Sequence, residues 1–374
     1  MEAPKYDGLS IANIPNSILE GFGLRPRGEA LSVDLKLKDR VALVLLDGLG
    51  YDELVRAAGD LASRYSLSAK ITSVFPTTTA TALTSLSTGL TPCEHGVVAW
   101  SFYLKQVGAV IDSLFMSPFF WERDGLYNAG YDLRSLFEAP TIFSALSGAG
   151  LKARAFLPRG LGGGISRVLY DGAEVFEYVS PFDAFVNAGR FLRSERGLAY
   201  IYISTIDSVL HKYGPGTEES SAAIAGVLEE VEKLSSAYLA GASLIITADH
   251  GHERIEENIN LSKDGELLSL LDVPPHGDPR AVFLKTRRGP EELKAAVAKY
   301  GFQLIDRGAA ASSGLLGRCN GRFEERYGDF IAFPPSGKAA LYLYRPKNED
   351  PLKFKGHHGG LSSGELYVPL LVRE

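Results

Sequence analysis

Cysteine, tryptophan and methionine are scarce in this chain of 374 residues, which contains only two of each. The two cysteines, Cys93 and Cys319, lie far apart in the sequence and fit neither a disulfide framework nor a CxxC pair. We therefore expect reduced thiols and a cytoplasmic location. Residues 1–16 mix charged residues with two prolines and show no secretory signal pattern, which supports the same expectation.

Long apolar runs and blocks of one charge are also absent from the sequence. No apolar run approaches the roughly 20 residues of a transmembrane helix, so we expect no membrane span. The formal net charge is −6, from 39 Lys and Arg against 45 Asp and Glu. Because no basic run is present, binding to a nucleic-acid polymer is not indicated. Hydrophobic residues make up 45% of the chain and charged residues 22%, as in globular proteins.

Several apolar segments end at a polar residue, in the way that buried parallel strands end at a loop. These segments, each with the polar residue that follows it, are 41–46 before Asp47, 71–75 before Thr77, 199–204 before Asp207, and 243–248 before Asp249. Helical stretches separate them, and residues 218–240 are expected to form one crossover helix. The pattern predicts an α/β fold with a doubly wound, mostly parallel sheet and helices on both faces. Ligands bind at the carboxyl ends of the strands in such folds, so these polar residues are expected to converge.

Between residues 253 and 348 the pattern of strands with polar ends stops, and shorter segments indicate a small α+β unit. We expect residues 1–252 and 349–374 to form the catalytic α/β domain, with 253–348 as an inserted cap. A last strand is predicted over 366–372, and its Pro369 favours an edge position because proline cannot donate a ladder hydrogen bond. The aromatic-rich stretch 100–137 either overhangs the site or forms a packed cluster of surface loops.

Aspartate and histidine gather after the predicted strands. Both are common ligands of zinc, and manganese and iron compete for such nitrogen and oxygen sites. Asp207 and His211 are four residues apart and so share one side of a helical turn or tight loop. Asp249 and His250 are adjacent and can reach one ion only from an irregular loop. Each residue alone is explained as well by a helix cap or a packed histidine, but together they favour a metal site.

Five short motifs follow one another in order along the chain: FPTTT at 75–79, TGLTPCEHG at 88–96, DSVLHKYGP at 207–215, DHG at 249–251 and HG at 358–359. These motifs resemble those of the type I phosphodiesterase/nucleotide pyrophosphatase family of the alkaline-phosphatase superfamily. The resemblance covers residues 41–251 and 356–372, and the segment 253–348 contributes nothing to it. It implies a hydrolase with two divalent metal ions, of which Zn²⁺ is the first expectation and Mn²⁺ or Fe the alternatives.

Residue by residue, the resemblance implies two ligand sets: Asp207, His211 and His358 for one metal, and Asp47, Asp249, His250 and the Thr79 oxygen for the other. Thr79 takes the place of the nucleophile, so a phospho-threonine intermediate is expected. A cation and the first turn of a helix both favour the threonine alkoxide. The threonines at 77, 78 and 81 are then structural. His357 is the rival of His358, His252 is expected beside the metal loop, and His276 is expected to be exposed.

At two positions the sequence differs from the family motifs, so the resemblance does not identify the substrate. Ala80 stands where the family has an aromatic residue after the nucleophile, and Trp100 stands where it has an asparagine. Trp100 is a candidate substrate-binding residue, with simple packing as the alternative. The expected reaction is hydrolysis of phosphodiester or pyrophosphate bonds in small nucleotides. The alternatives are hydrolysis of phosphonates or phosphomonoesters, and a metal-dependent phosphomutase reaction. A non-catalytic binding protein with this fold would be expected to lack a metal ligand, and all six Asp and His ligands are present.

Overall fold

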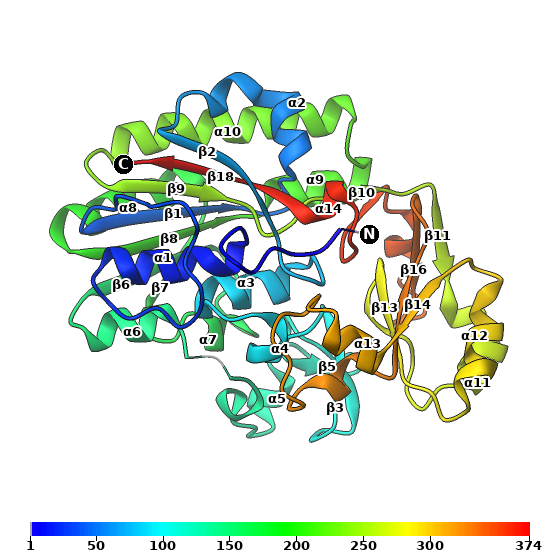
Figure 1. Cartoon of the computed structure of the whole chain (residues 1–374). Coiled ribbons are helices and arrows are strands. Elements are labelled where there is room, and N and C mark those ends of the chain that lie inside the picture. The colour runs from blue at the N-terminus through cyan, green and yellow to red at the C-terminus, as the bar shows by residue number, and fades with distance from the viewer. Residues whose placement is uncertain (1, 139) are drawn as a thin grey trace.

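The computed structural model describes residues 2–138 and 140–374, and a seven-stranded sheet forms its centre (Figure 1). The strand order is β2-β18-β9-β1-β8-β6-β7. The strands are β1 (Arg40–Leu46), β2 (Leu67–Thr72), β6 (Lys152–Pro158), β7 (Glu174–Tyr178), β8 (Gly197–Ile203), β9 (Ser243–Thr247) and β18 (Tyr367–Arg373). Strand β18 runs antiparallel to both of its neighbours, and every other pair of adjacent strands in this sheet is parallel. The predicted α/β class with a mostly parallel sheet is confirmed.

Helices cover both faces of this sheet, which explains why β8 and β9 bury every residue and read as continuous apolar runs (Figure 1). One face carries α2 (Tyr51–Ala62), α8 (Pro181–Ser194), α9 (Thr205–Tyr213) and α10 (Glu218–Tyr238), and the other carries α1 (Ile14–Gly21), α3 (Thr79–Thr88) and α6 (Ile142–Gly148). Helix α10 is the predicted crossover between β8 and β9. In the part of the chain that the structure describes, no helix is both long and apolar enough to span a bilayer.

A second seven-stranded sheet joins the insert to the aromatic-rich stretch, in the order β14-β15-β13-β12-β3-β4-β5. Its strands are β3 (Ser101–Leu104), β4 (Ala109–Asp112), β5 (Ser117–Pro118), β12 (His276–Asp278), β13 (Ala281–Leu284), β14 (Gln303–Asp306) and β15 (Phe330–Phe333). The stretch 100–137 is therefore built into the same sheet as the insert. The division at residues 252 and 349 stays a prediction.

Smaller elements complete the description. The helices are η1 (Ile11–Asn13), α4 (Pro92–His95), α5 (Gly125–Asn128), η2 (Leu133–Leu136), α7 (Ser166–Leu169), η3 (Leu261–Lys263), α11 (Gly265–Ser269), α12 (Pro290–Ala298), α13 (Arg307–Ser312), η4 (Glu324–Tyr327), η5 (Asp350–Lys353) and α14 (Ser363–Leu366). The strand pairs are β10 (Glu253–Arg254) with β17 (Gly356–His357), and β11 (Glu257–Asn260) with β16 (Lys338–Leu341).

Strand β13 shows how the insert is fixed to the α/β domain. Successive side chains of a strand point to opposite faces of the sheet. Ala281 and Phe283 therefore join the main hydrophobic core, while Val282 and Leu284 join a separate cluster. That second cluster also takes Leu293 of α12. One face of this second sheet thus shares the core of the central α/β sheet, and a smaller core lies on its other face.

The predicted edge position of the last strand is wrong. Strand β18 lies inside the sheet, between β2 and β9. Its register with β9 begins at Leu370, opposite Thr247, so Pro369 lies one residue outside that ladder and no donor is missed there. The Pro369 carbonyl instead accepts a hydrogen bond from the Thr247 hydroxyl, at 2.8 Å.

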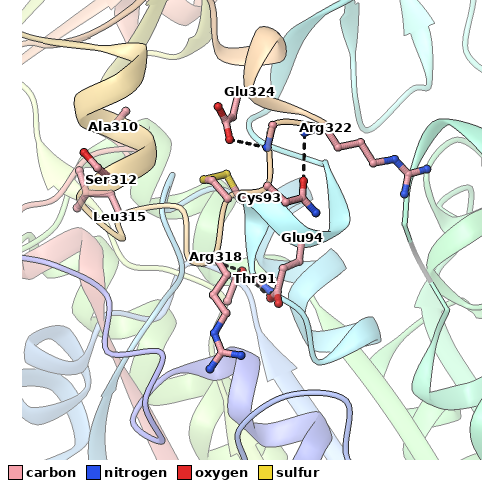
Figure 2. The surroundings of a disulfide bond; sticks show 12 residues. Thr91, Cys93, Glu94, Ala310, Ser312, Leu315, Arg318, Arg322 and Glu324 are labelled. Atoms are coloured by element: carbon pink, nitrogen blue, oxygen red, sulfur yellow. Dashed lines mark hydrogen bonds between the residues drawn. A yellow bond between two sulfur atoms is a disulfide. The ribbon is translucent and has the colours of Figure 1, made fainter.

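The expectation of two reduced cysteines is also wrong. Cys93 and Cys319 form a disulfide, with their Cα atoms 4.9 Å apart across a sequence separation of 226 residues (Figure 2). Cys93 lies in the short helix α4 and is buried. The bond links the segment that follows helix α3 to the insert. It removes one ground for the predicted cytoplasmic location, which stays a prediction.

Replacing both cysteines by serine is expected to lower the melting temperature by roughly 2–5 °C, because the bridge closes a long loop and such bridges contribute about 2–4 kcal/mol. Thermal unfolding followed by circular dichroism measures this shift. The control is the double variant in reductant, which should melt at the same temperature with and without the reagent. An unchanged melting temperature on reduction of the wild type would contradict the stabilising role.

Candidate metal centre

The carboxyl edge of the central sheet collects the acidic and histidine residues that the sequence analysis selected. Among the described residues, two groups of possible metal ligands lie there, each with its ligand atoms within 4.8 Å of one another. The first group consists of Asp207, His211, His252 and His358, and the second group of Asp47, Asp249 and His250. The two groups adjoin, since the His250 and His358 rings stack with centroids 3.8 Å apart. All six predicted ligands are therefore brought together, while their role in binding metal stays a prediction.

The histidine rings are oriented by backbone carbonyls. Nδ1 of His211 lies 2.8 Å from the Gly356 carbonyl, Nδ1 of His250 lies 3.1 Å from the carbonyl of the following glycine, and Nδ1 of His358 lies 3.0 Å from the Thr77 carbonyl. A ring that donates from Nδ1 keeps its Nε2 lone pair free for a cation. Metal-binding histidines in proteins are commonly held in this way, so the orientation fits a metal ligand set.

Carboxylate oxygens in the second group are buried without hydrogen-bond partners. Oδ1 of Asp47 and Oδ2 of Asp249 are in this state. Buried polar atoms nearly always have a hydrogen-bond or ion partner, so each of these oxygens is expected to contact an ion or a water molecule. Burial raises the pKa of Asp47 well above its usual range, and the neighbouring carboxylates of Asp249 and Asp207 raise it further. A bound cation would remove both penalties, and the residues present therefore fit the two divalent ions that the resemblance implies.

Thr79 is the first residue of α3 and lies partly exposed beside the second group. Its Oγ1 lies 3.1 Å from Nε2 of His250. Thr78 is the N-cap residue of the helix, but its side chain makes no capping hydrogen bond. Thr81 is buried and its hydroxyl has no partner in the described residues. Of the four clustered threonines, Thr79 is the one whose hydroxyl contacts a candidate metal ligand.

The loop that carries His358 is held from two sides. The hydroxyl of Thr77 donates to the Gly360 carbonyl at 2.9 Å, and Oε1 of Glu365 accepts from the Gly360 amide at 2.8 Å. Glu365 is fully buried and pairs with Arg280 of the insert at 3.4 Å. The segment before α3 and the insert therefore both position the last histidine of the first group.

Gly48 allows the two groups to approach each other. It follows Asp47 with a φ of +79°, in the left-handed region that favours glycine. A Cβ at this position would lie 2.8 Å from Cα of Asp207 and 3.0 Å from Cε1 of His252. The turn after β1 thus needs glycine both for its backbone and for the contact with α9.

Comparison with protein families adds an independent finding. Residues 41–360 match the model of the family described as type I phosphodiesterase / nucleotide pyrophosphatase. The chain belongs to this family. It is accordingly a hydrolase of the phosphodiester or pyrophosphate type. A comparison with curated proteins finds no match.

Solved structures share the fold of this phosphodiesterase family member. Human ectonucleotide pyrophosphatase/phosphodiesterase 5 is 18% identical, with a TM-score of 0.68 over 89% of this chain and 87% of that chain. The murine protein is 17% identical, with a TM-score of 0.67 over 89% and 88%. Phosphonoacetate hydrolase from Sinorhizobium meliloti, in complex with phosphonoacetate, is 20% identical, with a TM-score of 0.61 over 89% of both chains.

Trp100, the predicted substrate contact, lies in the loop before β3 and is partly exposed. Its backbone amide donates to Oδ2 of Asp278 at 3.3 Å, and its ring meets Phe119 edge to face at 5.4 Å. The side chain lines a cavity together with Asp278 and Tyr344. Contact with substrate stays a proposal.

His252, expected beside the metal loop, belongs to the first group, with Nε2 3.2 Å from Oδ1 of Asp207. One residue near the centre was not predicted from the sequence. Asp278 comes from the insert, where no motif marked it, and it is buried next to Thr78 with a pKa raised to about 7 by burial. The expectation that His276 is exposed is wrong, because β12 buries it in the second sheet.

Proposed function

We propose that this family member hydrolyses phosphodiester or pyrophosphate bonds of small nucleotides, with two divalent metal ions and a phospho-threonine intermediate on Thr79. The observation that carries the proposal is the position of the Thr79 hydroxyl, 3.1 Å from His250 of the second group, whose ring stacks on His358 of the first group. The first ion would be held by Asp207, His211 and His358, and the second by Asp47, Asp249, His250 and Thr79.

The residues divide the reaction into two displacements. When bound, the metal ions would lower the pKa of the nucleophile, polarise the phosphoryl oxygens and stabilise the leaving oxygen. Oγ1 of Thr79 releases its proton to water and forms the new P–O bond while the bond to the leaving group breaks, and the departing oxygen takes up a proton from water. A water molecule then attacks the phospho-threonine, which releases the phosphorus product and restores the threonine hydroxyl.

A solved relative supports the role of the threonine. A murine ectonucleotide pyrophosphatase/phosphodiesterase 5 variant, in which one threonine is replaced by alanine, is described as inactive and is bound to AMP. That structure is 16% identical to this chain, with a TM-score of 0.66. Phosphonate hydrolysis remains the second candidate, because phosphonoacetate hydrolase has the same fold.

We expect a nitrophenyl nucleotide diester to be cleaved with a kcat/KM at least about tenfold above that of the nitrophenyl monoester. A monoester carries about one more negative charge and needs an extra cationic partner. Among the described residues, Asp47, Asp207 and Asp249 form ion-pair contacts only with histidines. Lys212, beside His211, is exposed and its amine lies over the Tyr213 ring.

Parallel assays on the diester, the monoester, a dinucleoside polyphosphate and phosphonoacetate measure this preference. A higher kcat/KM for the monoester would overturn it. Cleavage of phosphonoacetate alone would assign the protein to the second candidate function instead.

The substitution His252→Gln is expected to weaken metal binding at the first group by about 10–100-fold, as losses next to a metal ligand set commonly do. The reason is its Nε2, which lies in the same group of ligand atoms as His358 and 3.2 Å from Oδ1 of Asp207. Competition with a fluorescent chelator measures the affinity directly. Unchanged affinity would show that His252 only packs against the centre.

A further inference from the structure

A small cavity lies at the amino edge of the central sheet, where β1 begins and where α8 and α10 end. Its volume is about 130 Å³. Pockets that hold drug-sized ligands have roughly 300–1,000 Å³, so only a small ligand fits in this cavity. The lining consists of Arg40 from β1, Gly189, Leu192 and Arg193 from α8, and residues 238–242 from the end of α10 and the turn after it.

The two arginines of this lining have no acidic partner. No Asp or Glu lines the cavity, and none of the ion pairs between the described residues includes Arg40 or Arg193. Asp39, next to Arg40 in the sequence, pairs with Arg196 at 3.0 Å. Nε of Arg40 is buried and has no hydrogen-bond partner in the described part of the chain. Because buried donors nearly always have an acceptor, this atom is expected to contact an anion or a water molecule.

The guanidinium of Arg193 reaches the contact between α8 and α10. A Cβ added to Gly189 would lie 2.4 Å from the Tyr238 carbonyl oxygen and 3.2 Å from Nη1 of Arg193. The glycine therefore lets the two helices approach, and Nη1 lies beside that contact although the residue as a whole is exposed. The C-terminal end of α10 favours a nearby cation. This helix end explains one guanidinium in the cavity, but it leaves the Nε donor of Arg40 unpaired.

The turn that follows α10 adds two backbone donors to the lining. The Ala242 amide donates to the Leu239 carbonyl at 3.1 Å, and Gly241 between them has a φ of +91°. Within the described residues the amides of Ala240 and Gly241 have no backbone acceptor, and both residues line the cavity. Guanidinium groups and free backbone amides around one cavity, with no carboxylate among them, are the donors that bind oxyanions in proteins.

We propose that this cavity, the arginine site, binds a small tetrahedral oxyanion such as phosphate between Arg40 and Arg193. Two uncompensated guanidinium groups favour an ion with two negative charges over an ion with one. The arginine site lies at the opposite end of β1 from Asp47, and a strand of seven residues spans about 23 Å. An anion bound here therefore does not contact the metal centre, and the proposal does not depend on the proposed reaction.

Tungstate locates the arginine site, because it is a tetrahedral oxyanion whose heavy atom gives a strong anomalous X-ray signal. Crystals of the metal-loaded full chain soaked in tungstate should show an anomalous peak between the guanidinium groups of Arg40 and Arg193. Crystals of Arg193→Gln should lose this peak and keep any peak at the metal centre. A wild type with tungstate at the metal centre alone, or with none bound, would overturn the proposal.

Calorimetric titration with inorganic phosphate measures the affinity. We expect a Kd of about 1 mM or lower for the wild type, weakened at least about tenfold in Arg40→Gln and in Arg193→Gln. Arg190→Gln is the matched control, because Arg190 lies about one turn earlier in α8 and does not line this cavity. Acetate, with one negative charge, should bind at least about tenfold more weakly than phosphate.

The metal content of each variant separates the two centres. Elemental analysis should give the same content in the wild type and all three arginine variants, so phosphate bound at the metal centre is the same in each. A loss of phosphate binding in Arg40→Gln and Arg193→Gln then belongs to the arginine site. Equal phosphate affinity in the wild type and both variants would overturn the proposal. Binding of phosphate only at tens of millimolar would do the same, because it would indicate an adventitious ion only.

Discussion

Turnover of the nucleotide diester is expected to fall at least about a thousandfold in Thr79→Ala, because the variant lacks the attacking oxygen. The structure places Oγ1 of this threonine 3.1 Å from His250. Steady-state kinetics measure the loss. Acid quenching of the wild type during turnover, followed by peptide mass spectrometry, should find the phosphoryl group on Thr79.

Thr81→Val is the control for this variant, because valine has the shape of threonine and the Thr81 hydroxyl has no partner in the described structure. It should retain turnover within a few-fold of the wild type. A trapped phosphoryl group on another threonine would contradict the assignment. Full activity of Thr79→Ala would exclude a covalent intermediate on this residue.

Removal of the metal ions is expected to abolish turnover, and His358→Gln is expected to lose an ion that His357→Gln keeps. His358 belongs to the first group, whereas the adjacent His357 is buried in β17 outside both groups. Loss of one ligand leaves a gap in coordination and should weaken binding of that ion by more than about 10–100-fold, the usual effect of losing a residue that merely supports a ligand. Elemental analysis of dialysed protein should give close to two ions for the wild type and for His357→Gln.

Chelation provides the companion measurement. Activity lost in chelator should return when Zn²⁺, Mn²⁺ or Fe²⁺ is added back, and the most effective ion would identify the metal. Equal metal content in both histidine variants would contradict the ligand assignment. A wild type that contains no metal and keeps its activity in chelator would contradict the two-metal proposal altogether.

The central sheet and most of the candidate centre could be predicted because both follow from local sequence. The run before Asp47 is apolar throughout, as burial on both faces of a sheet requires, and parallel strands bring their carboxyl ends to one edge. The spacing of Asp207 and His211 by one helical turn gave the direction of two side chains in α9. The order of the family motifs then placed His358 in the same centre as these residues, although the insert separates them in the sequence.

Contacts made by the insert could not be predicted, because they depend on tertiary packing. Asp278 has no local pattern that distinguishes it from a turn residue, and it reaches the centre only because β12 pairs with β3. The pairing of Cys93 with Cys319 likewise depends on where the chain folds back, not on any spacing in sequence. The edge position predicted from Pro369 was wrong because proline is also tolerated inside a sheet where the ladder with the neighbouring strand has already ended. The sequence does not show where that ladder ends.

The position of β18 inside the sheet has a consequence for biosynthesis. Strands β2 and β9 remain unpaired on their facing edges until residue 373 has left the ribosome, since β18 alone lies between them. Exposed edges of this kind recruit other chains, so a nascent chain that has passed residue 247 is open to misassembly or chaperone binding. His358 lies just before β18, so the first group of ligands is completed at the same late stage. We therefore expect the first metal ion to bind only after the central sheet is complete. Binding of that ion can then be used to detect when the sheet has formed.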